Sequence, residues 1–136
     1  MVDEQNVTVS PIGRSNTVLI IEDEDAMRWT LKENLIKEQF NVFEAEDGQK
    51  GLLLALEHHP DLILLDLVTP KLYGIDFIKK LRVDGWGKDA LIVVLTSLDN
   101  DEIINEAKNL GVYDYLTKKD WNLDEVIKFV KSKLDK

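Results

Sequence analysis

The stretch PDLILLDLVTP, residues 60–70, decides the fold of this 136-residue chain. Five of the six residues from Leu62 to Leu67 are apolar, and the exception is Asp66. A run this apolar predicts a strand buried on both faces, as in a parallel sheet covered by helices. A buried carboxylate without a compensating partner is strongly destabilising, so the place of Asp66 at the end of this strand needs a chemical explanation.

Strands and helices alternate along the rest of the chain. Apolar runs predict five strands, at residues 18–21, 40–44, 61–66, 90–95 and 112–116. Apolar residues at helical spacing predict five helices: one capped by Asp25, 48–58 behind Asp47, 73–82, one between Asn100 and Gly111, and 123–134 behind Asn122. Strict alternation with short connections is typical of a doubly wound α/β sheet with right-handed crossovers.

Polar side chains follow the predicted strands at their carboxyl ends, where doubly wound sheets bind ligands. They are Glu22 and Asp23 after the first strand, Asp66 after the third, Thr96 at the end of the fourth and Lys118 after the fifth. Solvent begins at strand ends, so at any single position a polar residue has an ordinary explanation. The set as a whole favours a site, because it combines carboxylates, a hydroxyl and an ammonium.

This combination predicts phosphoryl chemistry. Three carboxylates at one edge repel one another, and a divalent cation removes that repulsion. Mg²⁺ prefers oxygen ligands and is usually shared between carboxylates and a phosphate. A carboxylate such as Asp66 can attack phosphorus and form an aspartyl phosphate. Mg²⁺, Lys118 and Thr96 would then neutralise the charge on the phosphoryl oxygens.

At these residues the sequence resembles the receiver domains of two-component response regulators, over about residues 17–134. Four motifs carry the resemblance in the family's order: VLIIEDED, PDLILLDLVTPKLYG, VVLTS and YLTKK. The resemblance implies a flavodoxin-like, five-stranded parallel sheet of order 2-1-3-4-5 flanked by five helices. We expect a receiver domain at 17–136, after a flexible leader at 1–16 whose composition favours turns and coil.

The resemblance also implies roles for single residues. Asp66 would be the phosphoacceptor, supplied by a sensor histidine kinase or a phosphotransfer protein. Asp23 would bind Mg²⁺ directly and Glu22 mainly through water, while Asp66 and the backbone carbonyl of Val68 would be further metal ligands. Thr96 would act beside the acceptor.

Lys118 and Thr96 would hold the phosphoryl oxygens, and Thr96 and Tyr115 would move together on activation to change a protein-binding face.

Two departures from the family pattern matter. Lys119 stands where the family usually has proline, which leaves open a trans bond with a rearranged loop or a strained cis bond. Val68 and Leu98 are apolar at positions where polar residues can orient water, so we expect slow loss of the phosphoryl group.

Such a domain would catalyse its own phosphorylation and slow dephosphorylation, as a signalling switch rather than a conventional enzyme. The alternative is a pseudo-receiver that binds proteins without phosphorylation, which the complete set of site residues disfavours. An aspartyl-phosphate phosphatase would need a carboxylate at Val68. A flavodoxin-like cofactor binder would need a Ser/Gly/Thr-rich loop where residues 22–25 are acidic.

Composition limits the partners. The net charge of −9 disfavours direct contact with nucleic acid or anionic membranes. The absence of cysteine fits a reducing cytoplasm, and no stretch approaches the roughly 20 apolar residues of a membrane span. We expect a stand-alone chain that docks a downstream protein of unknown identity, as a monomer or as a dimer formed on phosphorylation.

Overall fold

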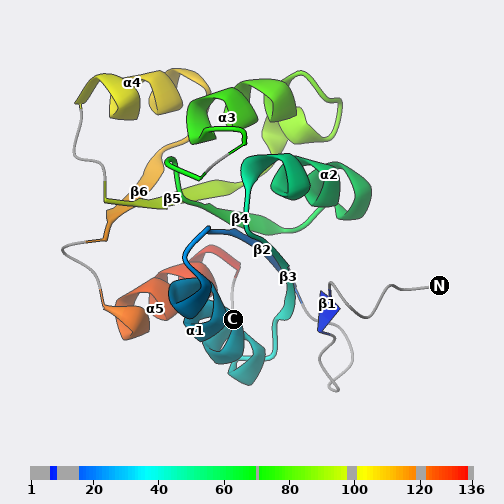
Figure 1. Cartoon of the computed structure of the whole chain (residues 1–136), viewed down its shortest axis with the longest axis vertical. Helices are drawn as coiled ribbons and strands as arrows, with labels where there is room; N and C mark the ends of the chain where they lie inside the picture. The colour runs from blue at the N-terminus through cyan, green and yellow to red at the C-terminus, as the bar shows by residue number, and fades with distance from the viewer. Residues whose placement is uncertain (1–6, 9–15, 70, 98–100, 119–121, 135–136) are drawn as a thin grey trace.

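A three-layer α/β sandwich forms the body of the chain in the computed structural model, which describes residues 7–8, 16–69, 71–97, 101–118 and 122–134 (Figure 1). The strands are β1 (Val7–Thr8), β2 (Thr17–Ile21), β3 (Asn41–Ala45), β4 (Leu62–Leu65), β5 (Ile92–Thr96) and β6 (Asp114–Thr117). The helices are α1 (Asp25–Lys37), α2 (Gly48–His58), α3 (Gly74–Arg82), α4 (Asp101–Asn109) and α5 (Leu123–Leu134), with a 3₁₀ turn η1 (Gly87–Asp89).

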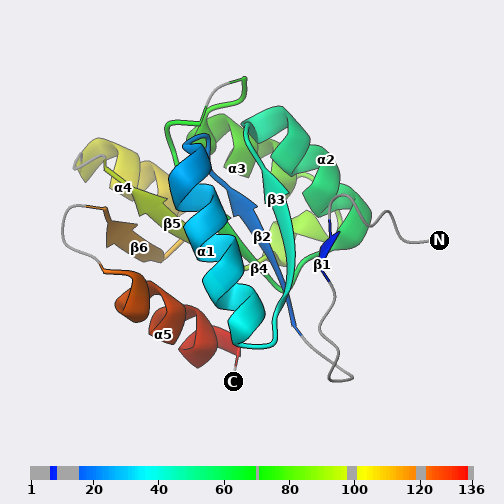
Figure 2. The same ribbon diagram turned by 60° about the horizontal axis from the view of Figure 1, so that its bottom comes forward.

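The sheet has the predicted topology. Its order is β1-β3-β2-β4-β5-β6, and the five strands from β3 to β6 run parallel. This confirms the five-stranded, doubly wound arrangement of order 2-1-3-4-5. Helices α1 and α5 cover one face of the sheet, and α2, α3 and α4 cover the other (Figures 1 and 2).

A short antiparallel strand is added to this sheet. Val7 of β1 pairs with Phe43 of β3, at the outer edge of the parallel strands. The sequence predicts only a flexible leader in this part of the chain. A two-residue strand without an apolar run carries no periodic signal, so local pattern could not have found it.

Alternate residues of the central strands enter different cores, which explains why the strands are apolar throughout. Ile63 and Leu65 pack on the α2–α3–α4 face, with Phe77 of α3. Leu62 and Leu64 pack on the α1–α5 face. All four strand residues are at most 1% exposed, as expected for a strand covered on both sides.

The predicted helix ends are confirmed in three places and wrong in one. Asp47 Oδ1 accepts a hydrogen bond from the N–H of Lys50 at 2.8 Å, and Asn122 Oδ1 accepts one from Glu125 at 2.9 Å. Gly111, with φ of 82°, follows α4 in the left-handed conformation that glycine permits. Asn100 lies outside the described residues.

The sequence predicts that Asp25 caps α1, but Asp25 is the first residue of the helix. Glu24 is the N-cap, and its side chain makes no capping hydrogen bond. The carboxylate of Asp25 instead pairs with Arg28, one turn later in the helix. Among the described residues, no helix combines the length and the apolar character that crossing a bilayer requires.

Two neighbouring glycines provide a test of the packing after α3. A Cβ added at Gly87 would overlap the carbonyl oxygen of Leu81, whereas one at Gly85 would meet nothing within 4 Å. We therefore expect Gly87→Ala to lower the free energy of unfolding by about 1–3 kcal/mol. Gly85→Ala should stay within about 0.5 kcal/mol of the parent chain. Urea unfolding measures the free energy of unfolding of both variants. Equal losses in the two variants would contradict the close packing of Gly87 against Leu81.

Candidate functional site

Asp66 lies at the edge of the sheet, directly after β4. Its backbone N–H donates to the carbonyl oxygen of Ile21 at 3.0 Å, so the pairing of β2 with β4 continues to this residue. The residue is 6% exposed. Its Oδ1 accepts a hydrogen bond from the N–H of Val68 at 3.0 Å, and its Oδ2 accepts one from Lys118 Nζ at 2.9 Å. The buried charge is therefore compensated on both oxygens.

The acidic pair after β2 stands beside this carboxylate. Glu22 is 2% exposed, whereas Asp23 is exposed to solvent. Glu22 Oε1 lies 2.7 Å from Lys118 Nζ, and Glu22 Oε2 accepts a hydrogen bond from the N–H of Glu24 at 3.1 Å. One carboxylate oxygen from each of Glu22, Asp23 and Asp66 lies within 4.8 Å of the others. The structure thus gathers all three predicted carboxylates.

Lys118 carries the balancing charge. Burial raises the pKa of Glu22, and the nearby Asp66 carboxylate adds to the rise, while hydrogen bonds from Lys118 and the Glu24 N–H only partly offset it. Burial alone would lower the pKa of Lys118, but its hydrogen bonds to Glu22 and Asp66 outweigh that effect, and the net shift is upward. Lys118 is therefore a stable ammonium at neutral pH.

Thr96 lies in β5, the strand next to β4, and Tyr115 lies in β6, one strand further out. Thr96 ends β5 and is fully buried, and its carbonyl oxygen accepts a hydrogen bond from the N–H of Lys118 at 2.7 Å. This bond fixes the backbone of Lys118 beside the carboxyl end of β5. Tyr115 pairs with Val94 in the sheet and packs against the core on the α2–α3–α4 face.

Two backbone carbonyls hold the turn after the acceptor, and Thr69, which bonds to one of them, is a residue that the sequence did not single out. Thr69 is fully buried, and its Oγ1 donates a hydrogen bond to the carbonyl oxygen of Asp66 at 3.1 Å. The N–H of Gly74 donates to the carbonyl oxygen of Leu67 at 2.9 Å. Threonine hydroxyls often bond to the backbone carbonyl three or four residues earlier, so a threonine in the predicted turn could have marked Thr69.

Arg28 is the second residue near the site that the sequence did not single out. Its Nη1 donates a hydrogen bond to the backbone carbonyl oxygen of Glu22 at 2.8 Å. An arginine in a helix that follows an acidic turn is common on protein surfaces, so its type and position alone gave no signal.

The fold and this site define a class of protein. Residues 18–131 match the response regulator receiver domain, and the chain belongs to that family of two-component signalling domains.

Individual proteins that are similar to this chain are also response regulators or transcriptional regulators. The transcriptional regulatory protein SrrA of Staphylococcus aureus is 38% identical over 104 residues, which cover 76% of this chain and 42% of that protein. The chain thus spans less than half the length of this curated relative. The chemotaxis response regulator CheY4 of Vibrio cholerae superposes with a TM-score of 0.80 at 26% identity, covering 88% of this chain and 99% of that one. The phosphorylated cyanobacterial phytochrome response regulator RcpA superposes with a TM-score of 0.73 at 28% identity, covering 88% and 91%.

Lys118 bridges the carboxylates of Glu22 and Asp66, and we expect this bridge to contribute to the stability of the fold. Replacing this lysine by methionine leaves two buried carboxylates facing each other, so we expect Lys118→Met to lower the free energy of unfolding by about 2 kcal/mol in chelator. Lys79→Met is the matched control, because Lys79 pairs with Glu106 at 3.6 Å where both side chains are about half exposed. Its loss should be at most about 0.5 kcal/mol. Urea unfolding in EDTA measures the free energy of unfolding of both variants. Equal losses in the two variants would contradict a stabilising role of the Lys118 bridge.

Proposed function

We propose that this chain is a phosphorylation switch in which Asp66 accepts a phosphoryl group from a sensor histidine kinase or a phosphotransfer protein. The observation that carries the proposal is the carboxylate of Asp66 held at the sheet edge between Lys118 Nζ and the Val68 N–H, beside Glu22 and Asp23. Membership of the receiver family supports it, and so does the phosphorylated state of the similar RcpA.

The chemistry of the donor set fits Mg²⁺, because three carboxylates converge on one point of the sheet edge. Asp23, Asp66 and the backbone carbonyl of Val68 would bind the ion directly, and Glu22 would act mainly through water. When bound, the ion would neutralise part of the charge on the phosphoryl oxygens. The exposure of Asp23 leaves one side of the cluster open to solvent, which suits an ion that keeps several waters.

The residues of the chain have separate parts in the transfer. A carboxylate oxygen of Asp66 forms a bond to phosphorus while the bond from phosphorus to the donor imidazole nitrogen breaks, and the imidazole takes a proton from solvent. Lys118 then exchanges its contact with the carboxylate for one with a phosphoryl oxygen. The hydroxyl of Thr96 donates a hydrogen bond to another phosphoryl oxygen.

The switch itself would run through Thr96 and Tyr115. A shift of Thr96 toward the phosphoryl group would vacate space for the Tyr115 ring, and the change would be read on the face of α4, β6 and α5 (Figure 1). Phosphorylation biases such a two-state equilibrium only through its different contacts in the two states. A downstream protein, or a second copy in a phosphorylation-dependent dimer, would bind this face in the cytoplasm.

Mass spectrometry tests the acceptor. Incubation with acetyl phosphate and Mg²⁺ should add about 80 Da to the chain, and EDTA should prevent it. Asp66→Asn should abolish the addition. Asp76→Asn, at an exposed position in the first turn of α3, should leave it unchanged. An unmodified parent chain, or equal labelling of Asp66→Asn, would contradict the proposal and favour a pseudo-receiver.

The lifetime of the phosphoryl group gives a further test. The Val68 side chain is 43% exposed beside the acceptor and offers no polar group to an attacking water; Leu98 lies outside the described residues. We expect Val68→Asn to shorten the half-life of the phosphorylated chain about three- to tenfold, because an amide can orient water. Val68→Leu, the apolar control, should keep the long half-life. Loss of label from the parent chain within seconds would refute this expectation.

A further inference from the structure

Arg28 contacts three acidic or carbonyl groups around the turn that supplies the acidic pair. Its Nη1 donates to the carbonyl oxygen of Glu22 at 2.8 Å, its Nε to Glu44 Oε1 at 3.2 Å, and its Nη2 to Asp25 Oδ1 at 2.6 Å. Its side chain is only 14% exposed. All three nitrogens of the guanidinium are therefore engaged within the chain.

The carbonyl of Glu22 is the important contact, because it belongs to the peptide that joins Glu22 to Asp23. Glu22 is also held by its own N–H, which donates to the carbonyl oxygen of Ala45 at 3.0 Å. Among the described residues, no hydrogen bond or ion pair holds the Asp23 carboxylate. The direction of that carboxylate therefore depends on the backbone that Arg28 fixes.

Glu44 anchors the guanidinium to the sheet. It lies in β3 opposite Ile20 of β2, and its Oε2 is 2.8 Å from Lys32 Nζ. Burial alone would raise the pKa of Glu44, but Lys32 and Arg28 outweigh that effect and the net shift is downward. Glu44 thus stays ionised at neutral pH and keeps a strong acceptor for Arg28.

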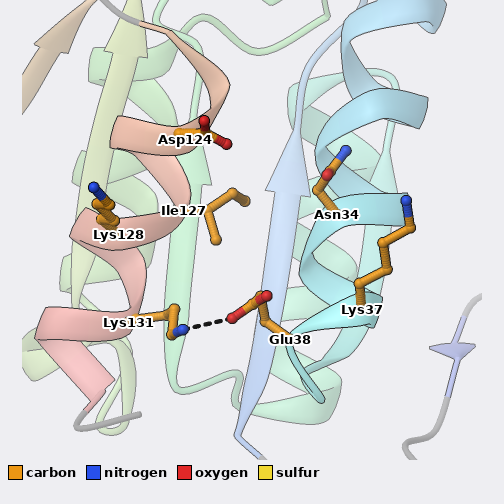
Figure 3. A pocket seen from close by; sticks show the side chains of 7 residues that line it. All are labelled: Asn34, Lys37, Glu38, Asp124, Ile127, Lys128 and Lys131. Carbon is orange, nitrogen blue, oxygen red and sulfur yellow. Dashed lines mark hydrogen bonds and ion pairs between the residues drawn. The ribbon is translucent and has the colours of Figure 1, made fainter.

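The helix that carries Arg28 is also held at its far end. An ion pair joins Lys131 of α5 to Glu38, which follows α1, beside a hollow of about 230 Å³ between the two helices (Figure 3). The sticks in Figure 3 show the two side chains extending toward each other across this hollow. This partly exposed pair is a weak tie, and the burial of Leu31 and Leu35, both at most 1% exposed, does more to fix the helix from which Arg28 reaches the acidic turn.

We propose that Arg28 is a positioning residue for cation binding: it holds the Glu22–Asp23 peptide so that the Asp23 carboxylate faces Asp66. This rests on the proposed function, in which these carboxylates share Mg²⁺. The competing explanation is an ordinary ion pair that fastens α1 to β3. Lys32 separates the two, because it binds the same Glu44 and, within the described part of the chain, makes no hydrogen bond or ion pair with Glu22.

Binding of Mn²⁺, a divalent ion with the same preference for oxygen ligands, tests the proposal without any phosphoryl transfer. Free Mn²⁺ is measured by electron paramagnetic resonance, and Mg²⁺ is added as competitor. Arg28→Met should weaken binding of both ions about tenfold, the lower end of the effect expected for groups that orient metal ligands. Lys32→Met should change it by less than about twofold.

Arg28→Lys keeps the charge and provides a variant that folds if the methionine variant does not. A single ammonium cannot reach three acceptors in the arrangement of a guanidinium, so its affinity should lie between those of the parent and Arg28→Met. With acetyl phosphate, both Arg28 variants should need more Mg²⁺ for the half-maximal rate and should approach the parent rate at saturating Mg²⁺. A purely structural role would lower the melting temperature and leave this Mg²⁺ requirement unchanged.

The results distinguish the two proposals. Parent-like Mn²⁺ affinity in both Arg28 variants, or an equal loss in Lys32→Met, would overturn the role of Arg28 while labelling of Asp66 in the parent chain still stands. Failure of the parent chain to bind Mn²⁺ or to be labelled at Asp66 would instead overturn the proposed function, and the role of Arg28 with it.

Discussion

The ammonium of Lys118 lies between two buried carboxylates, 2.7 Å from Glu22 and 2.9 Å from Asp66, and the edge of the sheet depends on this bridge. Without it, two anions would face each other at a place where water cannot screen them well. The bridge stabilises the fold at the place where the proposed phosphoryl transfer would occur. A cation and a phosphoryl group bound here would only need to redistribute charges that the protein has already brought together.

Parallel pairing is what brings these groups to one point. Glu22 follows β2, Asp66 follows β4, and Lys118 follows β6, and their strands run in the same direction through the sheet. Each central strand is covered on both faces, so its side chains are apolar until the chain leaves the sheet. Polar chemistry is thereby confined to the strand ends, which is the physical basis of the general rule for doubly wound sheets.

Removing one partner from a buried set of charges is costly, whereas replacing the whole set by apolar side chains of the same volume is often neutral or stabilising. The buried charges at this edge are therefore better explained by the proposed function than by stability alone. Arg28 and Thr69 add fixed hydrogen bonds to the backbone on both sides of the cluster, at Glu22 and at Asp66. Rigid backbone allows the carboxylates to remain close without relaxing apart.

The residue pattern alone was enough to predict the alternation of elements, the parallel sheet, three of the helix ends and the residues that meet at its edge. These follow from local periodicity and from one topological rule, so a single chain is enough to predict them. Four features became visible only in the folded chain: Glu22 is buried while the adjacent Asp23 is exposed, Arg28 holds the turn, Asp25 does not cap α1, and Val7 pairs with Phe43. Those outcomes depend on register and side-chain direction between segments far apart in the chain, and such contacts leave no periodic pattern in the residues that make them.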